Sequence, residues 1–190
     1  LKVSSSGGFG ADAARKLALD GYRVFGCVYD RETDSAKHVE VSWADLDMLH
    51  GSKYIQSQCA EAIAAAALVD EPVAFFGTPC QIAGLDALLH KQGKRDSALL
   101  IELICHGVPS ALLWDRYLEE RIQKDGIAPH PLVSFRSKAQ GWSSKLMMMM
   151  SDSKDYSALE SKDDFYAFFS RSLCYSKSCY ECPYRERSSA

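Results

Sequence analysis

Hydrophobic and polar positions along the chain follow two spacings, one typical of helices and the other typical of strands. Helical spacing of apolar residues, or a high alanine content, marks five segments. The predicted helices span residues 9–19, 59–69, 80–92, 109–124 and 163–173. Short apolar or alternating runs predict strands over residues 23–29, 38–43, 72–76, 98–105, 132–136 and 145–150. Gly21 and Gly93 follow the first and third helices, where glycine commonly ends a helix.

Strands and helices alternate from residue 72 to residue 124, which favours a βαβ unit with a parallel pair of strands. The last two strands are joined by a loop that contains Gly141 and Trp142, and an antiparallel hairpin is expected there. We therefore predict an α/β or mixed α+β fold with a parallel sheet, a smaller antiparallel hairpin and a cysteine-rich C-terminal loop. Residues 1–190 are expected to form a single domain.

Composition and charge narrow the class of protein. Apolar residues make up 47% and charged residues 25%, an ordinary globular balance, in a chain long enough for a sizeable core. The net charge of −3 provides no broad basic field for nucleic acid. No run approaches the roughly 18 apolar residues that a membrane helix needs. A signal peptide is not visible, so a cytoplasmic location is expected. The chain begins at Leu1 and ends at Ala190, and both ends are expected to be cut from a longer protein.

Seven cysteines are the main source of candidate chemistry. An odd number without a secretion signal argues against a disulfide framework and indicates a reducing compartment. Cys27 lies in an apolar run and Cys59 opens the alanine-rich helix, so both are expected to be small core residues. The other five are Cys80, Cys105, Cys174, Cys179 and Cys182.

Two cysteines occupy matching places on successive strand–helix units. Cys80 lies in the run GTPCQ (77–81), and Cys105 opens CHGVP (105–109). Each run ends an apolar strand and opens a helix, and sites in open α/β sheets gather at the carboxyl ends of strands. A helix start also favours the thiolate, the form that ligates a metal or attacks a substrate. If the two strands are neighbours, both thiols face one crevice, with His106 as a ligand, a proton donor or a structural residue.

The C-terminal cysteines have the spacing Cys174-x4-Cys179-x2-Cys182, followed by Pro183. A CxxC pair lets two thiolates reach one metal centre from a tight loop. The pattern occurs both in iron–sulfur proteins and in zinc sites. It therefore indicates a metal without deciding which metal.

The N-terminal segment is a weaker candidate site. Residues 4–8 are Ser-Ser-Ser-Gly-Gly and precede the helix that begins at Phe9. Small residues allow a ligand close to the backbone, and a helix start presents free N–H groups to a phosphate. The alternative is a plain helix cap after a flexible end.

With these motifs together, the chain resembles the coenzyme F420 hydrogenase/dehydrogenase beta-subunit family. The matching motifs follow family order and cover nearly the whole chain: SSGGF (5–9), GSKYIQS (51–57), GTPCQ (77–81), CHGVPS (105–110), FRxKxxGW (135–142) and SCxxC (178–182).

The resemblance implies FAD, a 4Fe–4S cluster and electron transfer between a reduced partner and a hydride acceptor. The implied cluster ligands are Cys80, Cys105, Cys179 and Cys182. For Cys174 two alternatives are open: it replaces Cys179 as a ligand, or it packs behind the loop. The implied cofactor contacts are Ser5, Ser6, Gly7, Gly8, Lys53, Tyr54, Gly77 and Thr78. The implied partners are a ferredoxin-like domain or another electron-transfer subunit, and coenzyme F420 or a similar hydride acceptor. Such a module is an oxidoreductase.

Two other functions remain open from the residues alone. One is a binding module stabilised by structural zinc through the C-terminal cysteines. The other is an enzyme with Cys80 as nucleophile and His106 as base, which requires the two side chains within hydrogen-bond reach.

Overall fold

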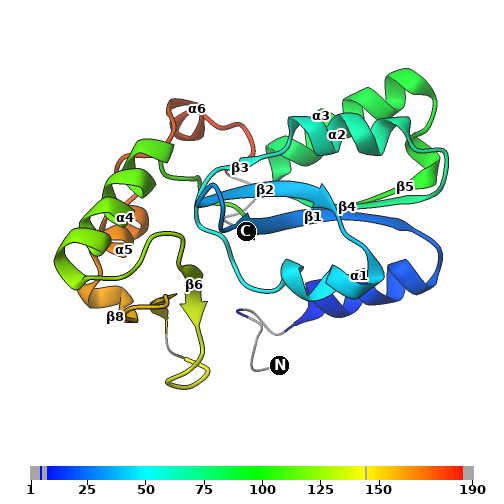
Figure 1. Cartoon of the computed structure of the whole chain (residues 1–190). Coiled ribbons are helices and arrows are strands. Elements are labelled where there is room, and N and C mark those ends of the chain that lie inside the picture. The colour runs from blue at the N-terminus through cyan, green and yellow to red at the C-terminus, as the bar shows by residue number, and fades with distance from the viewer. Residues whose placement is uncertain (1–4, 6–7, 144, 186–190) are drawn as a thin grey trace.

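The strands of the protein form two separate sheets, as the computed structural model of the chain shows (Figure 1). The structure describes residue 5, residues 8–143 and residues 145–185. One sheet has five strands in the order β3-β2-β1-β4-β5, and the other has three in the order β6-β7-β8. The mixed α/β architecture expected from the sequence is confirmed.

The five-stranded sheet is mostly parallel. Its strands are β1 (Arg23–Asp30), β2 (Ser35–Glu40), β3 (Ser57–Gln58), β4 (Val73–Gly77) and β5 (Ala98–Glu102). The pairs β1–β4 and β4–β5 are parallel, and β2 runs antiparallel to β1. The predicted βαβ unit is therefore confirmed as β4, the helix α3 (Pro79–Gln92) and β5.

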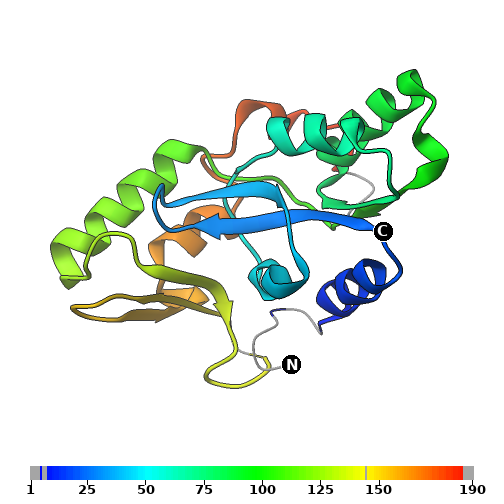
Figure 2. The ribbon, with the colours of Figure 1, turned by 45° about the vertical axis from the view of Figure 1, so that its right-hand side comes forward.

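Helices cover both faces of this sheet (Figures 1 and 2). The helix α1 (Phe9–Leu19) and the 3-10 helix η1 (Trp43–Leu49) lie on one face, and α2 (Ala60–Leu68) lies with α3 on the other. Successive strand residues point to opposite faces. Phe75 accordingly packs towards α2 and α3, whereas Ala74 packs towards α1 and η1.

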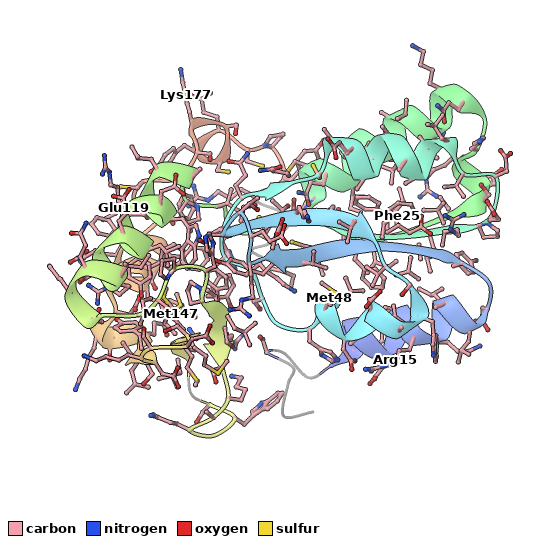
Figure 3. All side chains as sticks on the ribbon, in the orientation of Figure 1. Arg15, Phe25, Met48, Glu119, Met147 and Lys177 are labelled. Atoms are coloured by element: carbon pink, nitrogen blue, oxygen red, sulfur yellow. The ribbon has the colours of Figure 1, made fainter. Side chains whose placement is uncertain are left out.

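The second sheet forms a core with two helices. Its elements are α4 (Ala111–Asp125), β6 (Leu132–Ser137), β7 (Leu146–Met150), β8 (Tyr156–Leu159) and α5 (Asp164–Ser170). Trp114, Phe135 and Phe165 pack together in its centre. The buried Asp163 carboxylate accepts hydrogen bonds from the hydroxyls of Tyr117 (2.5 Å) and Tyr156 (3.0 Å), which fastens α4 and β8 to the start of α5. Figure 3 shows the dense side-chain packing of this part around Met147.

Three further short elements occur in the described residues. They are η2 (Arg95–Ser97), η3 (Glu160–Lys162) and α6 (Lys177–Tyr180). The predicted hairpin is confirmed as β6 and β7, and β8 joins it as a third strand. In the described part of the chain, no helix is both long and apolar enough to cross a bilayer.

Two predicted strands have wrong boundaries. The strand expected over residues 38–43 begins earlier, at Ser35, because the polar start of β2 pairs with the end of β1. It ends at Glu40, and η1 begins at Trp43. The strand expected over residues 98–105 ends at Glu102, since its partner β4 ends at Gly77. Beyond that point Ile104 is 80% exposed.

Candidate functional site

The candidate site lies where β4 and β5 end. Gly77 and Glu102 are register partners in these two parallel strands. Cys80 and Cys105 each follow their strand's last residue by three positions, so the two cysteines leave the sheet at the same edge. The predicted placement of both at the carboxyl ends of neighbouring parallel strands is therefore confirmed.

Cys80 stands in the first turn of α3, and its thiol is exposed. Thr78 is the N-cap residue, and Gln81 Oε1 accepts a hydrogen bond from the Thr78 N–H at 2.9 Å, which closes a capping box. The Thr78 hydroxyl lies 3.4 Å from Cys80 Sγ. Gly77 is buried, and a Cβ there would lie 3.1 Å from a ring atom of Phe75. These contacts explain the GTPCQ run structurally, and a cofactor contact at Gly77 or Thr78 stays a prediction.

The loop after β5 is fastened to the C-terminal cysteine segment. The Ser110 N–H donates to the Cys174 carbonyl at 2.8 Å, and the Ser176 N–H donates to the Val108 carbonyl at 3.0 Å. These bonds lie on either side of an antiparallel bridge between Pro109 and Tyr175. The chain thereby brings the CxxC segment to the end of β5, although the two are about 70 residues apart.

Gly107 and Tyr175 fix this contact. Gly107 has φ +120°, a conformation that favours glycine, and the Tyr175 ring packs directly against it. The Tyr175 hydroxyl donates to the Phe169 carbonyl at 3.0 Å, which ties the segment to α5. The sequence motif CHGVP therefore needs its glycine for packing as well as for backbone geometry.

The CxxC pair sits on and just after the short helix α6. The Cys179 N–H donates to the Ser176 carbonyl at 2.8 Å. The Tyr180 hydroxyl accepts from the Tyr175 N–H at 3.0 Å and donates to the Ser172 carbonyl at 3.1 Å. Cys179 and Cys182 are half-buried, whereas Cys174 is exposed.

Electrostatics link four of the cysteine thiols. Burial raises the pKa of Cys105, and a hydrogen bond from the Gly107 backbone opposes that rise. Negative charge on Cys80, Cys179 and Cys182 raises the pKa further, so all three thiols lie within electrostatic reach of Cys105. A bound cation would reverse this repulsion, because it stabilises thiolates.

The spread of these thiols bears on which metal group they suit. Within residues 8–143 and 145–185, no three His, Cys, Asp or Glu side chains converge closely enough to hold one metal ion. A structural zinc needs four ligands at about 2.0–2.3 Å from a single ion. In a 4Fe–4S cluster each iron takes its own cysteine, so the ligands surround a larger body. A 4Fe–4S cluster or a zinc ion held by these cysteines stays a prediction.

The Ser/Gly segment meets the GSKY segment. Ser5 is buried, and its hydroxyl accepts a hydrogen bond from the Ser52 N–H at 3.0 Å. Gly8, with φ +87°, immediately precedes α1. Ser6 and Gly7 lie outside the described residues. Two of the motifs expected to contact a flavin are thus side by side, and their contact with a cofactor stays a prediction.

Lys53 and Tyr54 have contacts within the chain. The Lys53 ammonium donates to the carbonyls of Met48, Leu49 and His50 at 3.1, 3.2 and 2.9 Å, and so closes the end of η1. These bonds use all three donors of the ammonium. Burial lowers the pKa of Lys53 to about 8, with charge on Cys27 opposing the shift. The Tyr54 ring stacks on Phe169, with centroids 4.7 Å apart. Cofactor binding by Lys53 and Tyr54 stays a prediction.

Cys27 is half-buried and packs against the core around Trp114 and Phe135, as expected. The expected core position of Cys59 needs correction, because Cys59 is half-buried and is the N-cap residue of α2 rather than part of the helix core. Charge on Cys80 raises the pKa of Cys59 after the larger effect of burial, so these two thiols also lie near each other. The sequence placed Cys59 at the opening of the alanine-rich helix, but it carried no signal that Cys80 lies nearby.

The nucleophile alternative finds no support in the described residues. His106 is exposed, and the hydrogen-bond partner of Cys80 Sγ is the Thr78 hydroxyl. No hydrogen bond or ion pair joins Cys80 to His106 in the part of the chain that the structure describes.

The protein is thus a mixed α/β domain with two cysteines at the carboxyl ends of neighbouring parallel strands. Over residues 70–189, the chain matches the family model for the C terminus of the coenzyme F420 hydrogenase/dehydrogenase beta subunit. It belongs to this family, and the match includes all four candidate ligand cysteines. A comparison with curated proteins found no match.

Proposed function

We propose that the chain is an electron-transfer module that couples a 4Fe–4S cluster and FAD to hydride exchange with coenzyme F420 or a similar acceptor. The observation that carries this proposal is the placement of Cys80 and Cys105 at the ends of neighbouring strands, with the segment of Cys179 and Cys182 bonded to the loop after β5. These thiols come from three separate segments, and membership of the family places them in an oxidoreductase subunit. When bound, the flavin supplies hydride exchange and the cluster supplies single-electron transfer, which no side chain can provide.

The residues of this chain hold and shape the iron site. Cys80, Cys105, Cys179 and Cys182 supply the four thiolates. Cys105, Cys179 and Cys182 are half-buried, so water reaches them less easily. Access of water would promote loss of a cluster. Tyr175 and Gly107 hold the CxxC segment against the loop after β5, which would keep Cys179 and Cys182 on the same side of the domain as Cys105.

The start of α1 is proposed to hold the phosphates of FAD. Gly8 adds no side chain at the start of α1, and the first N–H groups of a helix attract an anion. The Ser5–Ser52 hydrogen bond fixes the approach to this helix. Cys80 is the exposed member of the four cysteines, so its side of the site would face the electron donor. The donor would be a ferredoxin-like domain or another subunit.

Anaerobic purification followed by metal, sulfide and flavin analysis tests this function. The expected result is about four iron and four sulfide per chain, bound FAD and broad visible absorbance from both groups. A colourless protein that contains zinc and no sulfide would contradict the proposal and favour the zinc-stabilised module. Iron and sulfide without flavin would contradict the assignment of the α1 site.

A further inference from the structure

Cys59 and Cys80 stand at the starts of two neighbouring helices. Cys59 is the N-cap residue of α2, and Cys80 lies in the first turn of α3. The two helices pack against each other over the same face of the sheet (Figure 1). The Gln81 side chain donates a hydrogen bond to the Ser57 hydroxyl at 2.8 Å, which draws the two helix starts together.

The same hydrogen bond brings the two cysteine positions together, because Gln81 directly follows Cys80 and Ser57 lies two residues before Cys59. Cys80 is exposed and accessible to a small oxidant, and Cys59 is half-buried beside it.

Cys105 is the competing neighbour of Cys80. Its thiol accepts a hydrogen bond from the Gly107 backbone and interacts with Cys179 and Cys182. It also belongs to the loop that the Tyr175 ring holds in place. Cys59, at the start of a helix and outside that clamped loop, is the partner with fewer constraints on approaching Cys80.

We propose that Cys59 and Cys80 form a reversible disulfide when a peroxide oxidises the protein, and that this removes Cys80 from the iron ligands. The second clause rests on the proposed iron site, whereas the first does not. Cys80 sulfur attacks one peroxide oxygen, the O–O bond breaks, and sulfenic acid and water form. Cys59 sulfur then attacks the Cys80 sulfur and releases a second water. Two thiols lose two electrons and two protons in total, and hydrogen peroxide accepts them.

The sequence around these residues makes the bond easy to map. Trypsin cleaves after Lys53 and Lys91, and no Lys or Arg lies between, so both cysteines fall in one peptide. A glutamate-specific protease then cuts after Glu61, between the two cysteines. The expected result after hydrogen peroxide treatment of the anaerobically purified full chain is that the Cys59 and Cys80 fragments stay joined. Dithiothreitol should separate them.

Matched variants make the outcome decisive. Cys59→Ser should abolish the joined fragments, and Cys27→Ser, which alters another half-buried cysteine, should retain them. Peroxide should also lower the iron content of the wild type, and dithiothreitol with added iron and sulfide should restore it. Absence of the joined fragments, or a bond from Cys80 to Cys105 instead, would overturn the proposal. Joined fragments in a protein that never held iron would support the disulfide and refute the proposed iron site.

Discussion

The Tyr175 ring occupies the space that a side chain at residue 107 would need: a Cβ on Gly107 would lie 2.3 Å from Tyr175 Cε2. This contact joins the loop after β5 to the segment that carries Cys179 and Cys182. Since Cys105 lies two residues before Gly107, the same contact sets how three of the four candidate ligands lie relative to one another.

Replacing Gly107 with alanine should therefore damage the iron site as well as the fold. The Cβ would push the Tyr175 ring away, and alanine at φ +120° is strained. We expect Gly107→Ala to lower the free energy of unfolding by about 1–3 kcal/mol, as overpacking does. It should also lose most of its iron when purified anaerobically.

The matched control is Gly84→Ala in the exposed middle of α3, where a Cβ would have no neighbour within 4 Å. Alanine is the better helix former, so this variant should gain about 0.5–1 kcal/mol and keep its iron. Equal iron content in the two variants would contradict the role given to the Gly107–Tyr175 contact.

A bulky residue at Gly8 should lower the flavin content. Gly8 has φ +87° and precedes α1, where the phosphates of FAD are proposed to bind. Gly8→Val adds a branched side chain at that point and strains the backbone. The measurement is flavin released by denaturation, per mole of protein. Gly10→Val, inside α1 where a Cβ has no neighbour within 4 Å, is the control. Unchanged flavin in Gly8→Val would argue against this binding site.

Lys53 should make stability rise with pH in a defined window. Its folded-state pKa is about 8, below the usual 10.5, because burial disfavours the ammonium. Between about pH 8 and 10.5 the unfolded chain binds more protons than the folded chain. The free energy of unfolding therefore increases as the pH rises through this window. Below pH 8 both states hold the proton, and the cost of the buried charge is present in full.

Urea unfolding under reducing conditions at several pH values measures this effect. Lys53→Met removes the titrating group, so the difference in free energy of unfolding between wild type and variant should shift in favour of the wild type as pH rises through the window. Lys16→Met, which alters an exposed lysine of α1, should show no comparable shift. A pH-independent difference between wild type and Lys53→Met would refute the lowered pKa.

The spacing of apolar residues and the positions of glycines predicted the helices whose ends depend on nearby residues. α1 and α3 were predicted within one residue of their bounds, because apolar spacing and the glycines at 21 and 93 mark their ends. The strand–Cys–helix repeat placed Cys80 and Cys105 at one sheet edge. The end of β5 could not be predicted, because the apolar run continues through Ile104 and only the end of β4 stops the pairing.

The features that could not be predicted from the sequence depend on contacts between segments that are far apart in the chain. The Ser5–Ser52 bond, the Tyr175 ring over Gly107 and the proximity of Cys59 to Cys80 each join segments that no periodicity relates. The strand β8 was missed because it has only four residues, and its pairing with β7 depends on the hairpin.

The most direct test of the account is iron and sulfide content, measured anaerobically, in single Cys→Ser variants at residues 80, 105, 179 and 182. Cys27→Ser and Cys174→Ser serve as controls, because neither residue is among the proposed ligands. The account predicts a large loss of iron and sulfide in each of the four variants and wild-type content in both controls. Full iron in all four variants, or an equal loss in Cys27→Ser, would contradict the claim that these four thiolates hold a 4Fe–4S cluster.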